Sequence, residues 1–172
     1  MAMPDIELPS TLEEASSVSL ARADGFNVCF FYPWTGRPGV PNPPNWDVIP
    51  GAHGYTPEAE GFRDLHAEFQ SVGAKIFGIS LQETEFQREF ASRMGLPFAL
   101  LSDAKGDLQT MLKLPTFETG GVTYLKRLTL LARDGVLVFT FYPVLDPAGH
   151  AGDVLKVLRQ KKHQEGGIGL PS

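Results

Sequence analysis

Short apolar runs alternate with amphipathic stretches along this chain and predict alternating strands and helices. Residues 26–34 (FNVCFFYPW) are almost wholly apolar and rich in aromatic side chains, which is typical of a buried central strand. Residues 74–80 and 96–103 predict two further strands. Residues 122–143 predict two strands joined by an Asp-Gly turn at 134–135, a frequent hairpin connection.

A helix is predicted directly after a long loop at residues 35–54, which carries five of the 14 prolines. Thr56 is a suitable N-cap and Pro57 a suitable first helical residue. Gly73 follows the last residue of this helix. Its buried face is defined by apolar residues at i, i+3 and i+7: Phe62, Leu65 and Phe69. Long ordered loops of this kind are often functional.

Three more helices are predicted, at residues 83–95, 106–114 and 149–162. The buried face of the first of them is formed by Phe86, Phe90 and Met94. The stretch 114–123 contains Gly120-Gly121 and is interpreted as a flexible connection without the spacing of a phosphate-binding loop.

The order of these elements is β-α-β-α-β, followed by a hairpin and a final helix. That order predicts an α/β three-layer sandwich, with a central mixed β-sheet flanked by helices, of the thioredoxin-like kind. We expect a single domain over residues 1–162 and a disordered tail at residues 163–172. In such a fold, the loop after the first core strand and the next helix N-terminus form the active site.

The composition argues against some classes of function but does not identify the function. The formal charge of −5 gives no support to nucleic-acid binding, and no apolar run is long enough to span a membrane. The N-terminal residues lack the features of a signal peptide, so a soluble, cytoplasmic protein is expected. The single cysteine, Cys29, excludes an intrachain disulfide and a CxxC redox pair.

Five segments, in this order, resemble the peroxiredoxin family of the alkyl hydroperoxide reductase C / thiol-specific antioxidant (AhpC/TSA) type. They read FFYPWTGRPG, GYTPEAEGFRDLHAEF, GAKIFGIS, LPFALLSDAKGDL and LKRLTLLARDGVLVFTFYP, and they cover roughly residues 7–160. The resemblance is closest to the branch of the bacterioferritin comigratory protein. It implies the thioredoxin-like fold already indicated by the order of elements.

The resemblance also implies where the family's chemistry is located. In the family, the loop-helix junction reads Gly-Cys-Thr-Pro-Glu/Gln, and its cysteine is the peroxidatic nucleophile; here that position is Tyr55. In many relatives, a resolving cysteine follows five residues later, where this chain has Glu60. Arg127, which in the family stabilises the thiolate and polarises the peroxide, is present, as are Pro33 and Thr56.

Tyr55 lies at the predicted helix N-terminus and could act as a hydrogen-bond donor or as an acid/base, with His53 as its partner. The alternatives are a phenol that only fills a vacated pocket and a solvated histidine. Cys29 lies inside an apolar strand, where it is expected to pack in the core. No metal-ligand spacing is present, so neither a metal nor another cofactor is expected.

Arg127 alternates with Lys126 along a strand, and could face Tyr55 and hold a small anion. The alternative is an ion pair with Glu58 or Glu60. The pocket would be lined by Pro33, Trp34, Thr56, Glu58 and Phe117, although the aromatic residues could equally pack the proline-rich loop.

These observations favour a peroxiredoxin-fold protein that has lost thiol-peroxidase activity. Its old pocket would bind or convert a small anionic or carbonyl-containing molecule, without a cofactor, through Tyr55 and Arg127. The second hypothesis is a non-catalytic binding or interaction protein with a plugged pocket. The third is a residual thiol-dependent peroxidase, an antioxidant oxidoreductase that would require an exposed Cys29. A homodimer is compatible with the resemblance, and whether the chain is an enzyme is left open.

Overall fold

The computed structural model describes residues 1–12 and 16–168. The strands are β1 (Leu8–Pro9), β2 (Ser17–Val18), β3 (Phe26–Phe31), β4 (Ala74–Ser80), β5 (Ala99–Ser102), β6 (Thr116–Thr119), β7 (Val122–Leu125), β8 (Leu128–Arg133) and β9 (Val136–Phe141). The helices are the short 3-10 helix η1 (Leu20–Arg22), α1 (Tyr55–Asp64), α2 (His66–Ser71), α3 (Thr84–Met94), α4 (Asp107–Leu112) and α5 (Pro147–Ile168).

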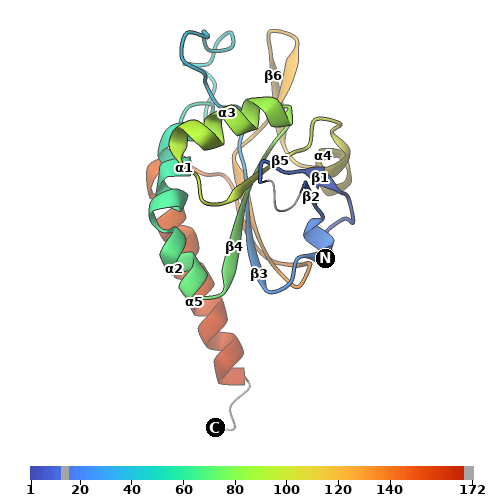
Figure 1. Cartoon of the computed structure of the whole chain (residues 1–172), viewed down its shortest axis with the longest axis vertical. Coiled ribbons are helices and arrows are strands. Elements are labelled where there is room, and N and C mark those ends of the chain that lie inside the picture. Colours follow the sequence, from blue (N-terminus) through green and yellow to red (C-terminus); the bar gives the residue numbers. More distant parts are fainter. Residues whose placement is uncertain (13–15, 169–172) are drawn as a thin grey trace.

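The main sheet has the strand order β5-β4-β3-β8-β9 (Figure 1). Strand β3 pairs in parallel with β4, and β4 in parallel with β5, whereas β3-β8 and β8-β9 are antiparallel. The predicted mixed sheet is therefore confirmed, and the apolar strand β3 lies at its centre. β1 pairs with β2, and β6 with β7, in two small separate hairpins.

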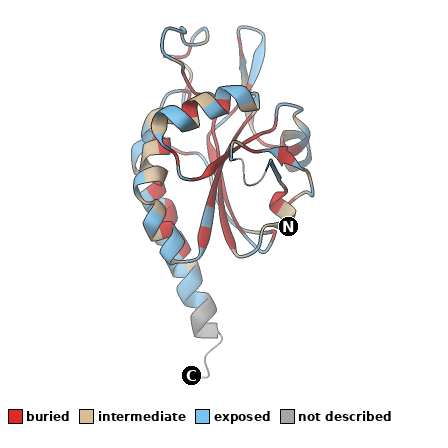
Figure 2. Ribbon diagram, in the orientation of Figure 1, coloured by how far each residue is buried: buried red, intermediate tan, exposed pale blue. Residues whose placement is uncertain are grey.

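Side chains alternate across the central strand and contribute to two cores. Figure 2 shows that the strands at the centre of the sheet are largely buried. Val28 and Phe30 point to the face covered by α1, α2, α3 and α5. Cys29 and Phe31 point to the other face, which is covered by the N-terminal segment, η1 and α4. Each face of the sheet is thus buried, which explains why β3 is apolar at nearly every position.

The stretch predicted to be a flexible connection, residues 114–123, contains strand β6 and the turn that leads into β7. Strand β7 falls within the first of the two strands predicted over residues 122–143, but it ends at Leu125 and pairs with β6 instead of continuing into β8. Gly120 and Gly121 both have positive φ, 59° and 76°, and therefore provide the two-residue turn that a tight hairpin requires. Phe117 and Tyr124, which are partners across the two strands, stack with ring centroids 5.5 Å apart. The polar, glycine-containing sequence provided no indication of strand β6.

Two helical predictions differ from the structure. The first helix begins at Tyr55 rather than after Thr56, and it breaks at Leu65 into α1 and α2. In α3, Phe86 is 44% exposed while Gln87 is fully buried. The reason is a hydrogen bond in which Gln87 Nε2 donates to the Leu101 carbonyl at 2.7 Å, so the amide turns inward.

The C-terminal helix is also longer than predicted. Helix α5 continues through Ile168, past residue 162, where the domain was expected to end. Residues 169–172 of the predicted tail lie outside the described residues. Within the described ranges, no helix is long and apolar enough to cross a membrane.

Candidate functional site

The proline-rich loop between β3 and α1 is packed rather than free. Trp46 is only 2% exposed and forms the centre of an aromatic cluster with Trp34, Phe117 and Tyr124. Its ring centroid lies 5.5 Å from that of Trp34 and 5.2 Å from that of Tyr124. This cluster holds the loop against the β6-β7 hairpin. In Figure 1, the loop and the hairpin project from the same end of the sheet.

Gly54 fixes the point at which the loop enters α1. Its φ is 110°, a left-handed conformation that L side chains rarely adopt. A Cβ atom at this position would also lie 2.6 Å from Pro147 Cγ, at the start of α5. Both constraints require glycine, and together they place Tyr55 as the first residue of α1.

The phenol of Tyr55 is enclosed by aromatic rings and backbone. Its ring meets Trp34 and Phe90 edge-on, at centroid distances of 6.0 and 5.9 Å. A Cβ atom added to Gly36 would overlap the Tyr55 hydroxyl oxygen. The space beside the ring has no room for a water molecule, and the hydroxyl makes no hydrogen bond with any residue in the described ranges. The Tyr55 side chain therefore occupies the space between these rings and the backbone.

Arg127 is paired with Glu58, one of the two partners that the sequence had left open. Arg127 NH1 donates to Glu58 Oε1 at 2.7 Å, and both side chains are 1% exposed. The other guanidinium nitrogens donate to backbone carbonyls of the loop end: Gly51 at 3.1 Å, His53 at 3.2 Å and Ala52 at 3.3 Å. Every nitrogen of the guanidinium thus has a partner within the chain.

The carboxyl group of Glu58 is an unusual acid. Burial raises its pKa to about 7, and the neighbouring Arg127 only partly opposes this shift. Its second oxygen, Oε2, has no hydrogen-bond partner within the described part of the chain. Near neutral pH, Glu58 can therefore gain or lose a proton inside the protein.

The remaining predicted site residues do not converge on one cavity. Pro33 and Trp34 line a groove of about 240 Å³. Phe117 and Arg127 border a different cavity of about 310 Å³, and Thr56 is half-buried in the first turn of α1. His53 pairs with Asp47 at the surface, with 2.6 Å between Nε2 and Oδ1. The catalytic and binding roles assigned to these residues stay predictions.

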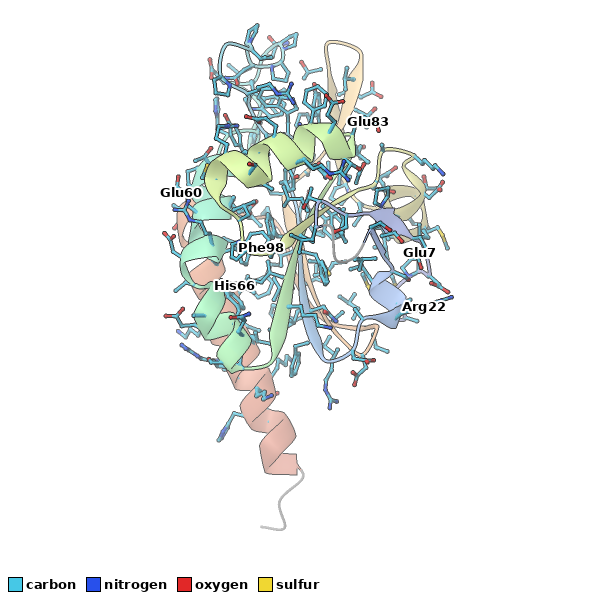
Figure 3. The ribbon with its side chains drawn as sticks, in the orientation of Figure 1. Glu7, Arg22, Glu60, His66, Glu83 and Phe98 are labelled. Carbon is cyan, nitrogen blue, oxygen red and sulfur yellow. The ribbon has the colours of Figure 1, made fainter. Side chains whose placement is uncertain are left out.

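Glu60 and His66 lie away from the junction. Glu60 is on the outer side of α1 in Figure 3, and His66 packs with its ring centroid 6.3 Å from that of Phe98. Among the described residues, no group of three or more His, Cys, Asp or Glu side chains could hold a metal ion.

Cys29, the one thiol of the chain, lies in the middle strand of the main sheet. It is fully buried, on the face of the sheet opposite to Tyr55. Burial raises the pKa of its thiol to about 12, so the thiol is protonated at neutral pH in the closed structure.

Sequence reasoning missed two residues that shape the junction. Gly36 leaves room for the Tyr55 hydroxyl. Arg93 of α3 donates a hydrogen bond to the Gly36 carbonyl at 2.7 Å, and the same guanidinium pairs with Glu89. The i, i+4 spacing of Glu89 and Arg93 was a visible sign of their ion pair. No sequence signal indicated that Arg93 also binds the loop.

This architecture, a central mixed sheet flanked by helices, is that of a thioredoxin-like fold. Residues 50–140 match the AhpC/TSA family. Peroxiredoxin Q of Sedum lineare, named as chloroplastic, is 31% identical over 161 residues, which cover 90% of this chain and 76% of that protein. The chain belongs to the AhpC/TSA family, and its likeness is to the peroxiredoxin Q branch.

A solved structure of the same kind confirms the fold. The bacterioferritin comigratory protein of Xanthomonas campestris, for which alkyl peroxide reduction activity is described, has a TM-score of 0.74 and 27% identity. The match covers 93% of this chain and 94% of that one. The chloroplastic peroxiredoxin Q of Oryza sativa subsp. japonica is 28% identical, and the chain spans 61% of its length.

The comparisons contradict the leading functional hypothesis from the sequence. That hypothesis assigned the fold to a protein without thiol-peroxidase activity and with a repurposed pocket; the second hypothesis, a non-catalytic protein with a plugged pocket, is contradicted with it. The relatives are named peroxiredoxins, and alkyl peroxide reduction is described for the Xanthomonas protein. Tyr55 at the junction, on which the hypothesis depended, is therefore insufficient reason to exclude peroxide chemistry.

The contact between Gly36 and Tyr55 generates a stability prediction. We expect Gly36→Ala to lower the free energy of unfolding by about 1–3 kcal/mol, because the added methyl group overlaps the phenol in a packed site. In a Tyr55→Phe background the loss should be smaller, since the hydroxyl is absent. Urea denaturation of the single and double variants measures this coupling.

Gly152→Ala is the matched control, because a Cβ atom at that helical position meets nothing within 4 Å. It should leave stability unchanged or increase it slightly. Equal losses for Gly36→Ala in both backgrounds would contradict the described contact.

The raised pKa of Glu58 predicts a pH-dependent stability. Its ordinary value is 4.5, so between 4.5 and about 7 the folded chain holds a proton that the unfolded chain releases. The contribution of Glu58 to stability is present below pH 4.5 and is lost as the pH rises to about 7. At about 1.36 kcal/mol per unit, the loss is roughly 3 kcal/mol.

Glu58→Gln removes this titration. Urea denaturation from pH 4 to 8 should therefore show that the free energy of unfolding of the variant rises relative to that of the wild type as the pH increases. Comparing the two proteins cancels the contribution of His150, whose pKa burial lowers to about 4 and whose slope has the opposite sign. Parallel stability curves would refute the protonation of Glu58.

Proposed function

We propose that this chain is a thiol-dependent peroxidase, an antioxidant oxidoreductase of the peroxiredoxin class that reduces hydroperoxides. The observation that supports it most directly is its membership of the AhpC/TSA family, together with the alkyl peroxide reduction described for its Xanthomonas structural neighbour. The sequence of the Sedum lineare relative and the fold of the Xanthomonas campestris structure each match this chain over most of its length.

The reaction needs one thiol and an external reductant. A cysteine thiolate attacks the distal oxygen of the hydroperoxide, so an S–O bond forms while the O–O bond breaks. The leaving alkoxide takes a proton and departs as an alcohol, or as water when the substrate is hydrogen peroxide. Two equivalents of a small thiol then reduce the sulfenic acid, which regenerates the cysteine and yields a disulfide and water.

Cys29 is the only residue of the chain that can supply this sulfur. Because its thiol is buried in the central strand and its pKa is raised to about 12, the closed fold holds it in an unreactive form. Reaction therefore proceeds through an opened form in which β3 admits peroxide and water. Turnover should accordingly be slow, and limited by this local opening.

The test is a peroxidase assay with cumene hydroperoxide and with hydrogen peroxide, using dithiothreitol as the reductant. We expect the wild type to consume peroxide above the protein-free rate, faster in urea concentrations just below the unfolding transition. Cys29→Ser should abolish the difference, while Cys29→Ala serves as a second variant that preserves the apolar packing. If wild type and both variants turn over equally, the proposal fails.

We further infer that Tyr55 occupies the position of the family's peroxidatic cysteine. A residue there heads α1, where the unpaired N–H groups and the helix dipole stabilise a thiolate. The buried guanidinium of Arg127 lies against the loop immediately before it, 3.7 Å from the position of a Cβ on Gly54. A thiol at position 55 would have both features that Cys29 lacks.

Tyr55→Cys should therefore raise peroxide turnover at least tenfold over the wild type, with a thiol pKa below its ordinary value of about 8.5. Tyr55→Ser is the matched control, because it opens the same space without sulfur and should show no gain. Thiol alkylation rates measured from pH 5 to 9 give the pKa. A Tyr55→Cys protein that is folded yet no faster than Tyr55→Ser would overturn this assignment of position 55.

A further inference from the structure

A cavity of about 310 Å³ lies beside the end of the proline-rich loop, and Tyr55 is not among its described lining residues. Three segments that are distant in the sequence form it: the end of the proline-rich loop, the β6 strand with the β7-β8 junction, and the segment between β9 and α5. Its apolar lining consists of Ile49, Pro50, Phe117, Tyr142, Pro143, Val144 and Leu145. This size and mostly apolar character suit one small organic ligand.

The charged lining residues of this cavity are two cations, Lys126 and Arg127. Arg127 is occupied, since its guanidinium is hydrogen-bonded to Glu58 and to three loop carbonyls. Lys126 differs: its side chain is exposed and has no ion pair or hydrogen bond within the described ranges. None of the described lining residues is acidic.

The apolar rim is unusually open to solvent. Among the lining residues, Leu145 is 88% exposed and Tyr142 is 47% exposed. Single exposed apolar side chains are common on proteins, but here they gather around a cavity with an uncompensated positive charge. An amphipathic molecule would cover them and place its charged end at Lys126.

We propose that this cavity binds an unbranched aliphatic carboxylate, with the carboxylate on the ammonium group of Lys126 and the alkyl chain along the apolar lining. The ammonium group donates a charge-assisted hydrogen bond, which is stronger than one between neutral groups. The alkyl chain gains free energy from the burial of its methylene groups. This inference is independent of the proposed peroxidase activity, because the binding uses neither Cys29 nor Tyr55.

The test is calorimetric titration of the full chain with decanoate at pH 7.5. We expect saturable binding of one molecule, weakened about tenfold by Lys126→Met and largely preserved by Lys126→Arg, since the cation and not the lysine stem holds the carboxylate. Lys105→Met, which removes an exposed lysine that lines a different cavity, is the matched control and should bind as the wild type does.

Decanol separates charge recognition from simple apolar adsorption. Decanol should bind the wild type at least tenfold more weakly than decanoate does. Its affinity for Lys126→Met should equal its affinity for the wild type. Leu145→Asp should also weaken decanoate, because it places a negative charge on the rim at a residue that is 88% exposed and therefore unimportant for folding. Absence of decanoate binding, or equal affinities for the wild type, Lys126→Met and Lys105→Met, would overturn the proposal.

Discussion

The buried ion pair between Glu58 and Arg127 is the interaction on which the functional end of this molecule depends. It joins helix α1, the last residues of the proline-rich loop and the residue that precedes β8. Removing both charges from water is costly, and the pair compensates because the guanidinium also satisfies three loop carbonyls. A loop whose backbone groups would otherwise be unpaired in the interior is thereby fixed at the N-terminus of α1.

The fixed loop end determines the rest of the site. Because Gly54 and Pro147 are in contact, the entry into α1 is also tied to the start of α5. The aromatic cluster around Trp46 then holds the other half of the loop on the β6-β7 hairpin. The space that remains is divided into separate cavities with different lining residues, and Tyr55 lines neither the cavity at Trp34 nor the cavity at Arg127.

The sequence predicted the strands of the main sheet well, because β3 and β4 are buried on both faces and their apolar runs are unambiguous. It failed at β6, where polar residues and two glycines resemble a loop although cross-strand packing of Phe117 stabilises a hairpin, and at the break between β7 and β8, which were predicted as one strand. In the site, residue types alone could not choose between a free and a paired Arg127. That choice depends on distances between segments about 70 residues apart, which no local pattern contains.

The fold offers two very different environments for a thiol. At the centre of a five-stranded sheet, Cys29 lies between the paired strands β4 and β8 with its side chain in one of the two cores, so its reactive form requires hydrogen bonds of the ladder to break. The rate of any chemistry there is multiplied by the population of the opened form, which falls tenfold for each 1.4 kcal/mol of opening free energy. At the head of α1, by contrast, the helix dipole acts on a residue that is only partly buried. Thiol chemistry in this chain is therefore governed by the stability of its central strand, whereas chemistry at the junction would be governed by the local electrostatics of the helix terminus.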